Sequence, residues 1–368
     1  MNKYILAIVT VIALLTNSNT VFGQQILKSG FDPNEYKMAL EINSHHFDTL
    51  LGKYTLPDPT AKLVFRSKEV GFDNRWDYWK TSNNVGIISI RGTAPTKVSW
   101  LENFYAAMVP ATGQIRNTDS TVFNYKLAKD SNAYIHVGWL FGLSFMAEDI
   151  NKMMHSEYDK GVRNFIIVGH SQGGVLAIML RSYLEYTDDA FNNDVFIKTY
   201  ASAPPKPGNL YYAYDFEEIT QGGWAFRVVN TADWVPQMPF TVQKIDDMNK
   251  LNPFATYKDL IKKEPWYARA YVNRTMKKIN NRSTKLQNTY TDLLGEKSFK
   301  FVAKALPTAV NPEPVTSFDY RVCGNAIILR PTKNYIDNYV EKSKKHVFIH
   351  HHFYAYYLLV SAHFPDRG

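Results

Sequence analysis

One serine of this chain stands between glycines in a pattern that serves nucleophilic catalysis. The motif Gly-His-Ser-Gln-Gly, with Ser171 at its centre, follows an apolar run over 165–168 and precedes a helix-compatible apolar run over 175–184. A buried strand, a tight turn and a helix form the context of a nucleophile elbow, which lifts the hydroxyl to the positive end of the helix. Glycines flank the serine because a Cβ there would clash with neighbouring backbone. An ordinary glycine turn is the alternative, and the flanking apolar runs favour a nucleophile.

A serine hydroxyl is a poor nucleophile until a base takes its proton and a carboxylate orients that base. In hydrolases with such an elbow the chain order is Ser, then Asp or Glu, then His. Here Ser171 is followed by Asp233, just after an apolar run over 225–229, and by histidines 350–352 near the C-terminus. The alternatives are a turn role for Asp233 and an exposed loop or metal patch for the histidines. No second ligand set with metal spacing and no H-E-x-x-H motif occur, which argues against a metal.

The N-terminus has the three-part form of a secretory signal. Lys3 precedes an apolar run over 4–15, which is too short to span a membrane, and small and polar residues continue to Gly23. We expect a signal peptide over 1–23, export to a periplasm or out of the cell, and one domain over 24–368. Cys323 is the single cysteine, so an internal disulfide is excluded and we expect this side chain to be a small buried apolar residue.

Apolar periodicity predicts an α/β fold with a mostly parallel, doubly wound sheet, because strand patterns alternate with helix patterns. Asp32 is expected to cap the first helix, with Glu35 completing a capping box. The expected strands are 63–66, 75–80, 85–91, 165–168, 195–201, 225–229 and 318–329, with a hairpin between 75–80 and 85–91. The expected helices are 32–51, 94–109, 140–155, 175–184 and a helical stretch over 257–294.

The expected helix over 94–109 has two interpretations. Its apolar residues recur at three- and four-residue spacing, and Pro110 ends it. It is either a surface helix that packs on the core or an amphipathic lid over an apolar site.

The positive charge is concentrated in one segment. The chain has a net charge of +8, and residues 241–304 contain 14 Lys and Arg against 6 Asp and Glu, which accounts for the whole excess. One apolar stripe is expected along this helical segment, with basic residues facing away. Nucleic acid binding is not indicated, because basic and aromatic residues do not interleave on a recognisable scaffold.

Several blocks, in order, carry a family resemblance. They are Arg91-Gly92-Thr93, His136 to Trp139, Gly169 to Gly174, Thr199 to Pro204 with Gly208-Asn209, and Arg227 to Asn230 with Asp233, Val235, Pro236 and Pro239. The chain resembles the class 3, fungal-lipase-like lipases of the α/β-hydrolase superfamily. The likeness spans roughly residues 85–240 and the C-terminus.

This resemblance implies Ser171 as the nucleophile and Asp233 as the acid. The histidine of the family stands three residues before a tyrosine, which His351 fits, so we expect His351 to be the base, with His352 as the second choice. The resemblance also implies an oxyanion hole made by Thr93 and by the backbone N–H of Gln172, and it favours a lid over 94–109.

The sequence departs from the family in two places. The residue after the nucleophile is commonly Leu and is Gln172 here, which we expect to make the mouth of the site more polar. Residues 241–310 form an apparent basic helical insertion, which could cap the site, bind an anionic surface, or be solvated without a partner.

The resulting hypothesis is an exported lipase that cleaves acylglycerols or related lipid esters through an acyl-enzyme, without cofactor or metal. A phospholipase A1 and a feruloyl or aryl esterase are alternatives on the same fold. The alternative from another class is a lipid-binding protein that has lost catalysis. The partners expected are a lipid ester and a lipid or anionic surface, with neither nucleic acid nor a transmembrane segment.

Overall fold

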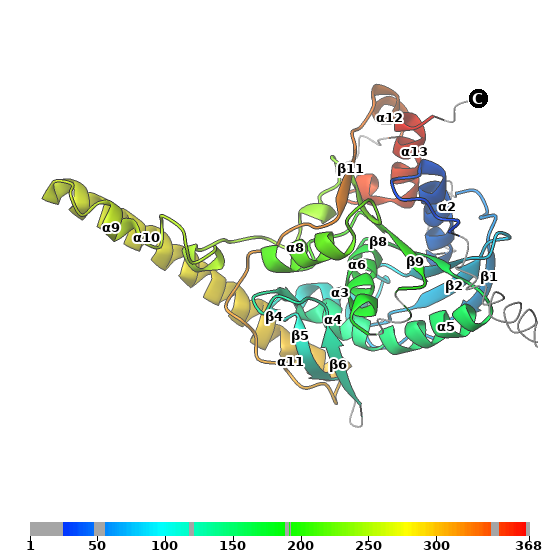
Figure 1. Ribbon diagram of the computed structural model, residues 1–368, viewed down its shortest axis with the longest axis horizontal. Coiled ribbons are helices and arrows are strands. Elements are labelled where there is room, and N and C mark those ends of the chain that lie inside the picture. Colours follow the sequence, from blue (N-terminus) through cyan, green and yellow to red (C-terminus); the bar gives the residue numbers. More distant parts are fainter. Residues whose placement is uncertain are drawn as a thin grey trace, which may run out of the picture.

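A seven-stranded sheet with the order β1-β2-β3-β8-β9-β10-β11 forms the centre of the structure (Figure 1). The computed structural model describes residues 25–47, 56–117, 121–187, 191, 193–339 and 346–365. The strands of this sheet are β1 Lys62–Arg66, β2 Trp76–Lys80, β3 Val85–Ile90, β8 Asn164–His170, β9 Phe196–Ser202, β10 Ala225–Asn230 and β11 Asn325–Leu329. The expected signal peptide lies outside the described residues.

The direction of the strands matches the predicted fold class. Within this sheet, neighbouring strands of the series β3, β8, β9, β10 and β11 pair in parallel. At one edge, β2 pairs antiparallel with both β1 and β3. The predicted hairpin is confirmed, since Trp76 pairs with Ile90. The central strands β3 and β8 are buried along their whole length, as their continuous apolar sequence requires in a sheet covered on both faces.

Two helical layers cover the sheet. Alternate residues of β8 belong to different cores, since Phe165 and Ile167 pack in one and Ile166 and Val168 in the other. The first core is completed by α4 Val137–Ser144, α5 Ala147–Asp159, α6 Gln172–Glu185 and α8 Leu210–Ile219. The second is completed by α2 Pro33–Ser44, α12 Lys333–Asn338 and α13 Phe353–His363. The chain is therefore doubly wound, as the sequence predicts.

The first helix begins as predicted and ends early. Asp32 accepts hydrogen bonds from the backbone N–H groups of Asn34 and Glu35 at 2.8 and 3.2 Å. The side chain of Glu35 does not close a capping box, because it accepts from Lys198 Nζ at 2.6 Å. Helix α2 ends at Ser44 and a 3-10 turn, η1 His45–Phe47, follows. The last part of the predicted helix lies outside the described residues.

Three other predicted elements have the wrong extent. The helix expected over 94–109 is α3 Lys97–Phe104, capped by Thr96, after which β4 Met108–Pro110 pairs with β7 Tyr134–His136. The helix expected over 140–155 is split between α4 and α5, because Asn117 Nδ2 donates to the carbonyl of Ser144 at 3.2 Å where α4 ends. The strand expected over 318–329 is reduced to β11, because Phe318 and Arg321 instead bridge to Val242 and Gly208.

The smaller elements complete the body of the molecule. Strands β5 and β6 form a hairpin, and three further 3-10 turns follow β10 in the chain. Their bounds are β5 Thr112–Arg116, β6 Val122–Lys126, η3 Val235–Gln237, η4 Ile245–Asp247 and η6 Ile349–His351. Cys323 is buried as expected.

The basic segment forms an arm that projects from the body (Figure 1). The arm is built by α9 Tyr257–Leu260 and the 26-residue helix α10 Trp266–Thr291. The π-helix η5 Asp292–Lys297 lies at its base, and α11 Ser298–Ala305 packs on the body, where Val302 is buried in the first core. The expected apolar stripe packs on a core only at the base of the arm, where Tyr290 stacks on the buried Phe318. Farther along α10, Ile279 and Leu286 are exposed, and the buried residue of this helix is Gln287. Gln287 donates to the carbonyl of Val242 at 2.7 Å and so fixes the base of the arm. No described helix is long and apolar enough to cross a bilayer.

Candidate active site

Ser171 lies at a strained turn between β8 and α6. Its φ of 62° and ψ of −129° place a non-glycine residue at positive φ, and its N–H donates to the carbonyl of Ser202 at 2.9 Å. A Cβ on Gly169 would lie 2.0 Å from the carbonyl oxygen of Gly173, and one on Gly173 would lie 2.3 Å from that of Ile90. Glycine is therefore required at both positions, as the motif predicts.

Asp233 and His351 meet although they lie 118 residues apart in the chain. Asp233 follows β10, His351 ends η6, and His351 Nδ1 lies 2.6 Å from Asp233 Oδ2. The carboxylate can only accept, so Nδ1 carries a proton, and the tautomer that this bond favours leaves Nε2 to act as a base. The side chains of Asp233 and His351 are both largely withdrawn from solvent.

The charge of Asp233 is stabilised from three directions. Burial of the carboxyl is the largest influence and acts to raise its pKa, but the hydrogen bonds to it lower the pKa below its ordinary value. The donors are His351, the hydroxyl of Tyr356 at 2.8 Å and the backbone N–H of Val235 at 3.0 Å. Asp233 is therefore an anion that can hold an imidazole ring in one orientation.

The three consecutive histidines have different surroundings. His350 Nδ1 lies 2.9 Å from the hydroxyl of Tyr335, and His352 precedes α13, where burial lowers the pKa of its ring. The structure brings His351 to Asp233, in line with the preference for His351 over His352.

The structure adds His170 and Ser202, which the sequence did not single out. His170 Nε2 lies 2.7 Å from the carbonyl of His351, and His170 Nδ1 lies 2.9 Å from Ser202 Oγ. Burial lowers the pKa of His170 to about 3, so the ring is neutral. Because a carbonyl only accepts, Nε2 donates to His351 and Nδ1 accepts from Ser202. His170 therefore ties the loop that carries His351 to the turn that carries Ser171.

The expected oxyanion residues lie on either side of Ser171. Thr93 follows β3, and its Oγ1 accepts from Asn103 Nδ2 at 3.1 Å, which leaves the hydroxyl proton free to donate. Gln172 begins α6, where the backbone N–H has no intrahelical partner.

The expectation that Gln172 makes the mouth of the site more polar is wrong. Its side chain is 2% exposed, and its Oε1 accepts from Ser99 Oγ of α3 at 3.4 Å. The amide therefore links the elbow to α3, beside the buried Glu102, whose pKa is raised by its burial. The neighbouring hydroxyl and carboxyl on α3 explain why a polar residue replaces leucine here.

Two cavities of about 310 Å³ each meet at Ser171. The first is also lined by Gly92, Thr93 and His351. The second is strongly apolar, and its wall includes residues of α3, of the loop after Asp233 and of the base of the arm. Those residues are Trp100, Phe104, Trp234, Phe240, Tyr290, Leu293 and Leu294. The second cavity can therefore hold an apolar group next to the serine.

Comparison with known proteins places this site in a family. A family model described as lipase (class 3) matches residues 87–243, a span that includes Thr93, Ser171 and Asp233. This region belongs to the class 3 lipase family. His351 lies outside the matched span, so its place beside Asp233 comes from the fold of this chain.

Curated relatives that are named as lipases match a part of the chain. The triacylglycerol lipase OBL1 of Ricinus communis is 27% identical over 190 residues, which cover 43% of this chain and 35% of that protein. The secreted mono- and diacylglycerol lipase LIP4 of Malassezia restricta is 28% identical over 159 residues, which cover 43% of this chain and 48% of that protein. The chain thus spans between a third and a half of the length of these relatives.

Solved structures of fungal lipases are also similar. The triacylglyceride lipase of Rhizomucor miehei has a TM-score of 0.42 at 16% identity and covers 58% of this chain and 77% of its own. The triacylglycerol lipase of Penicillium expansum has a TM-score of 0.43 at 18% identity and covers 57% of this chain and 75% of its own.

Proposed function

We propose that this class 3 lipase is a serine ester hydrolase that cleaves acylglycerols or related lipid esters through an acyl-enzyme on Ser171. The observation that carries the proposal is the 2.6 Å contact between His351 Nδ1 and Asp233 Oδ2, beside a cavity that Ser171 and His351 both line. The family and the names of the two lipase relatives support the same chemistry.

In the proposed reaction, Ser171 Oγ attacks the ester carbonyl carbon while His351 Nε2 accepts the serine proton. Asp233 stabilises the imidazolium that forms. The carbonyl oxygen becomes an anion, which the Thr93 hydroxyl and the Gln172 N–H bind. His351 then returns the proton to the leaving alcohol. Water, deprotonated by His351, then attacks the acyl-enzyme, and the acid is released as Ser171 Oγ takes that proton back from His351, so these steps need no cofactor.

The acyl chain is assigned to the apolar cavity walled by α3, the Trp234–Phe240 loop and the base of the arm. Its size and its tryptophan, phenylalanine and leucine side chains suit an aliphatic chain better than a polar group. Trp100 and Phe104 of α3 are also exposed at this cavity, so α3 is proposed as the element that meets a lipid interface, in the role of a lid. The basic segment 241–310 is proposed to add contact with an anionic surface.

Export is part of the proposal. It is supported by the signal-like pattern over residues 1–23 and by the Malassezia relative, which is named as secreted. Sequencing the N-terminus of protein recovered outside the cytoplasm tests it, and we expect the mature chain to begin after Gly23.

The enzymatic proposal is tested by hydrolysis of p-nitrophenyl butyrate and p-nitrophenyl palmitate. We expect activity to be lost in Ser171→Ala and His351→Ala and to be retained in His352→Ala. An organophosphonate should label Ser171 of the wild-type protein. A folded protein that neither hydrolyses these esters nor reacts with the phosphonate would be a lipid-binding protein instead. Hydrolysis confined to phospholipid or feruloyl esters would change the substrate class and leave the mechanism in place.

A further inference from the structure

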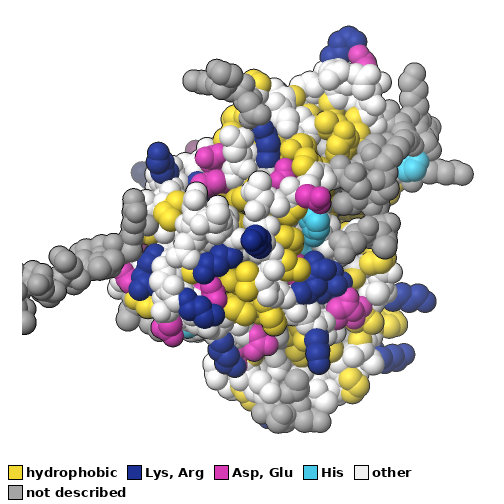
Figure 2. Space-filling model, turned by 90° about the vertical axis from the view of Figure 1, so that its right-hand side faces the viewer, with side chains coloured by type: hydrophobic (Ala, Val, Ile, Leu, Met, Phe, Trp, Pro, Cys, Tyr) yellow, Lys and Arg dark blue, Asp and Glu magenta, His cyan; other side chains and the backbone are white. Residues whose placement is uncertain are grey.

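The arm carries a concentrated and unneutralised positive charge. Residues 250–291 contain ten Lys and Arg against two acidic residues, Asp259 and Glu264, and all ten basic residues are exposed. Within the described residues none of the ten has an ion-pair partner, whereas basic residues of the body, such as Arg66, Lys198 and Arg163, pair with carboxylates. Figure 2 shows the end of the molecule opposite the arm, where side chains of both signs are interspersed. The arm is therefore the cationic part of this protein.

Helix α10 arranges part of this charge in a line. Residues that recur at intervals of three or four lie on one face of a helix. The cationic stripe, as we call it, follows this spacing from the tip towards the body: Tyr267, Tyr271, Arg274, Lys278, Arg282 and Lys285. A line of exposed cations along a straight helix can meet a flat anionic surface along its length.

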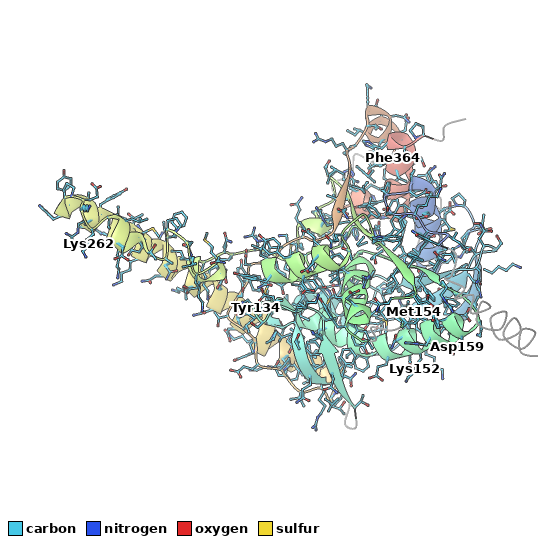
Figure 3. All side chains as sticks on the ribbon, in the orientation of Figure 1. Tyr134, Lys152, Met154, Asp159, Lys262 and Phe364 are labelled. Atoms are coloured by element: carbon cyan, nitrogen blue, oxygen red, sulfur yellow. The ribbon has the colours of Figure 1, made fainter. Side chains whose placement is uncertain are left out.

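The tip of the arm exposes large apolar side chains. Trp266, Tyr267, Tyr271 and Leu260 are 78%, 64%, 73% and 64% exposed. Lys262 belongs to the same tip, far from the body (Figure 3). Tryptophan and tyrosine favour the boundary between water and lipid, where the ring is buried and the polar atom stays hydrated. A helix that met only water would gain nothing from exposing these rings.

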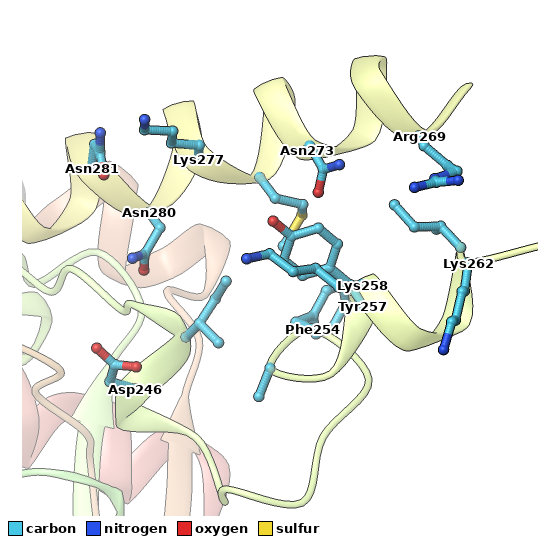
Figure 4. A pocket seen from close by; sticks show the side chains of 14 residues that line it. Asp246, Phe254, Tyr257, Lys258, Lys262, Arg269, Asn273, Lys277, Asn280 and Asn281 are labelled. Carbon is cyan, nitrogen blue, oxygen red and sulfur yellow. The ribbon is translucent and has the colours of Figure 1, made fainter. Parts of the chain in front are cut away.

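A groove between α9 and α10 combines the same two features. It has a volume of about 830 Å³, and Lys258, Lys262, Arg269 and Lys277 line it together with Phe254 and Tyr257 (Figure 4). Asp246 is its one acidic lining residue among those described, and Figure 4 places it at the far end from Lys262 and Arg269. Cations beside apolar rings suit a phosphate headgroup that is joined to an aliphatic chain.

We propose that the arm anchors this protein to membranes that contain anionic phospholipids. The positive charge of the stripe favours an anionic partner and disfavours a second copy of the arm, which would repel it. The exposed rings at the tip favour a bilayer over a nucleic acid. At its base the same helix contributes Tyr290 to the apolar cavity at Ser171, so an arm on a membrane holds that cavity next to lipid. The anchoring deepens the anionic-surface contact proposed above for the basic segment, and this last step rests in addition on the proposed catalytic function.

The test measures co-sedimentation of the full chain with vesicles of phosphatidylcholine, alone or mixed with phosphatidylserine. The stripe variant reverses four charges (Arg274→Glu, Lys278→Glu, Arg282→Glu, Lys285→Glu). The matched control reverses four exposed lysines of the body (Lys28→Glu, Lys62→Glu, Lys68→Glu, Lys152→Glu). Each cation near an anionic bilayer contributes roughly a fivefold gain in partitioning, so we expect the stripe variant to lose on the order of 10²–10³-fold affinity for the mixed vesicles.

The control variant should bind the mixed vesicles like the wild type, and added salt should weaken vesicle binding by both of these proteins. Ser171→Ala should bind vesicles fully, and the stripe variant should hydrolyse p-nitrophenyl butyrate at the wild-type rate. These two results separate the anchor from the catalytic proposal.

Three results would overturn the anchor. The first is equal vesicle binding by the stripe variant and the wild type. The second is an equal loss in the stripe and control variants, since net charge alone would then explain binding. The third is a wild-type protein that does not bind the mixed vesicles and instead binds a short duplex DNA at the same salt concentration. Dimerisation of the wild-type protein through the stripe, detected by sedimentation, would count in the same way.

Discussion

His170 Nε2 lies 2.7 Å from the main-chain oxygen of His351, whose own ring lies 2.6 Å from Asp233. The residue before the proposed nucleophile thus holds the residue proposed as its base. The bond joins positions 181 residues apart and closes the site between the elbow and the C-terminal turn η6. His170 also lines the first cavity, but both of its ring nitrogens are bonded within the protein, so we regard it as a positioning residue.

This relationship predicts that His170→Ala lowers kcat for p-nitrophenyl butyrate by about tenfold, because His351 loses a support worth roughly one hydrogen bond. KM should change little. His170→Gln is the matched variant, since its amide nitrogen can reach the same carbonyl, and it should recover most of kcat. Equal rates in the alanine variant and the wild type would show that η6 is held without His170.

The neutral state of His170 predicts how stability depends on pH. Burial, together with the nearby His351, lowers its pKa from 6.5 to about 3 in the native state. Between these values the unfolded chain binds a proton that the native protein does not. The free energy of unfolding should therefore be highest above pH 6.5 and fall as the pH drops towards 3, by about 1 kcal/mol per unit from this group.

Urea denaturation of the wild type and of His170→Gln across this window checks the slope. The variant should lose stability less steeply as the pH falls. His136, which burial also shifts to about 3, is present in both proteins and cancels in the difference. Asp233, whose lowered pKa makes its own contribution fade only at the acid end of this window, is likewise present in both proteins and cancels. Parallel curves for the two proteins would mean that His170 is charged in the native state.

The local parts of this site could be predicted from the sequence. Ser171 and its glycines form one contiguous motif, and Asp233 directly follows an apolar strand. These features depend on neighbours in the chain, which a single sequence displays. His351 was separable from His352 only by its spacing to Tyr354, and the structure places Asp233 beside it.

The remaining parts depend on contacts between distant segments. Tyr356 supports Asp233 and Tyr290 walls the apolar cavity, yet neither stands in a motif that predicts this. Periodicity also merged α3 with β4, because the buried residues Met108 and Val109 continue the apolar spacing of the helix although they pair with β7. Burial and strand pairing override helical spacing there, and spacing alone cannot show it.

Residues at the base of the arm line the apolar cavity, so we predict that enlarging one of them changes the preference for acyl chain length. Leu294 lines the apolar cavity, and its carbonyl accepts from the N–H of Ala107 at 3.2 Å, which fixes its position. Leu294→Trp should fill part of the cavity and lower the ratio of palmitate to butyrate hydrolysis roughly tenfold. Leu286→Trp, on the exposed surface of α10, is the control and should leave the ratio unchanged. An unchanged ratio in both variants would place the acyl chain elsewhere.

From the hydroxyl of Thr93 we predict that its removal lowers kcat, because the hydroxyl would stabilise the transition state and not the bound substrate. Asn103 Nδ2 donates to Thr93 Oγ1, so the hydroxyl proton points to another acceptor, which we propose is the oxyanion. Thr93→Val keeps the shape and removes this donor. We expect kcat to fall by roughly 10²–10³ with little change in KM, because the donor acts only when the charge develops. Thr93→Ser should retain most of the activity. If valine and serine variants were equally active, the backbone N–H of Gln172 would have to bind the oxyanion with another partner. A drop in both variants together with a raised KM would instead assign Thr93 to substrate binding.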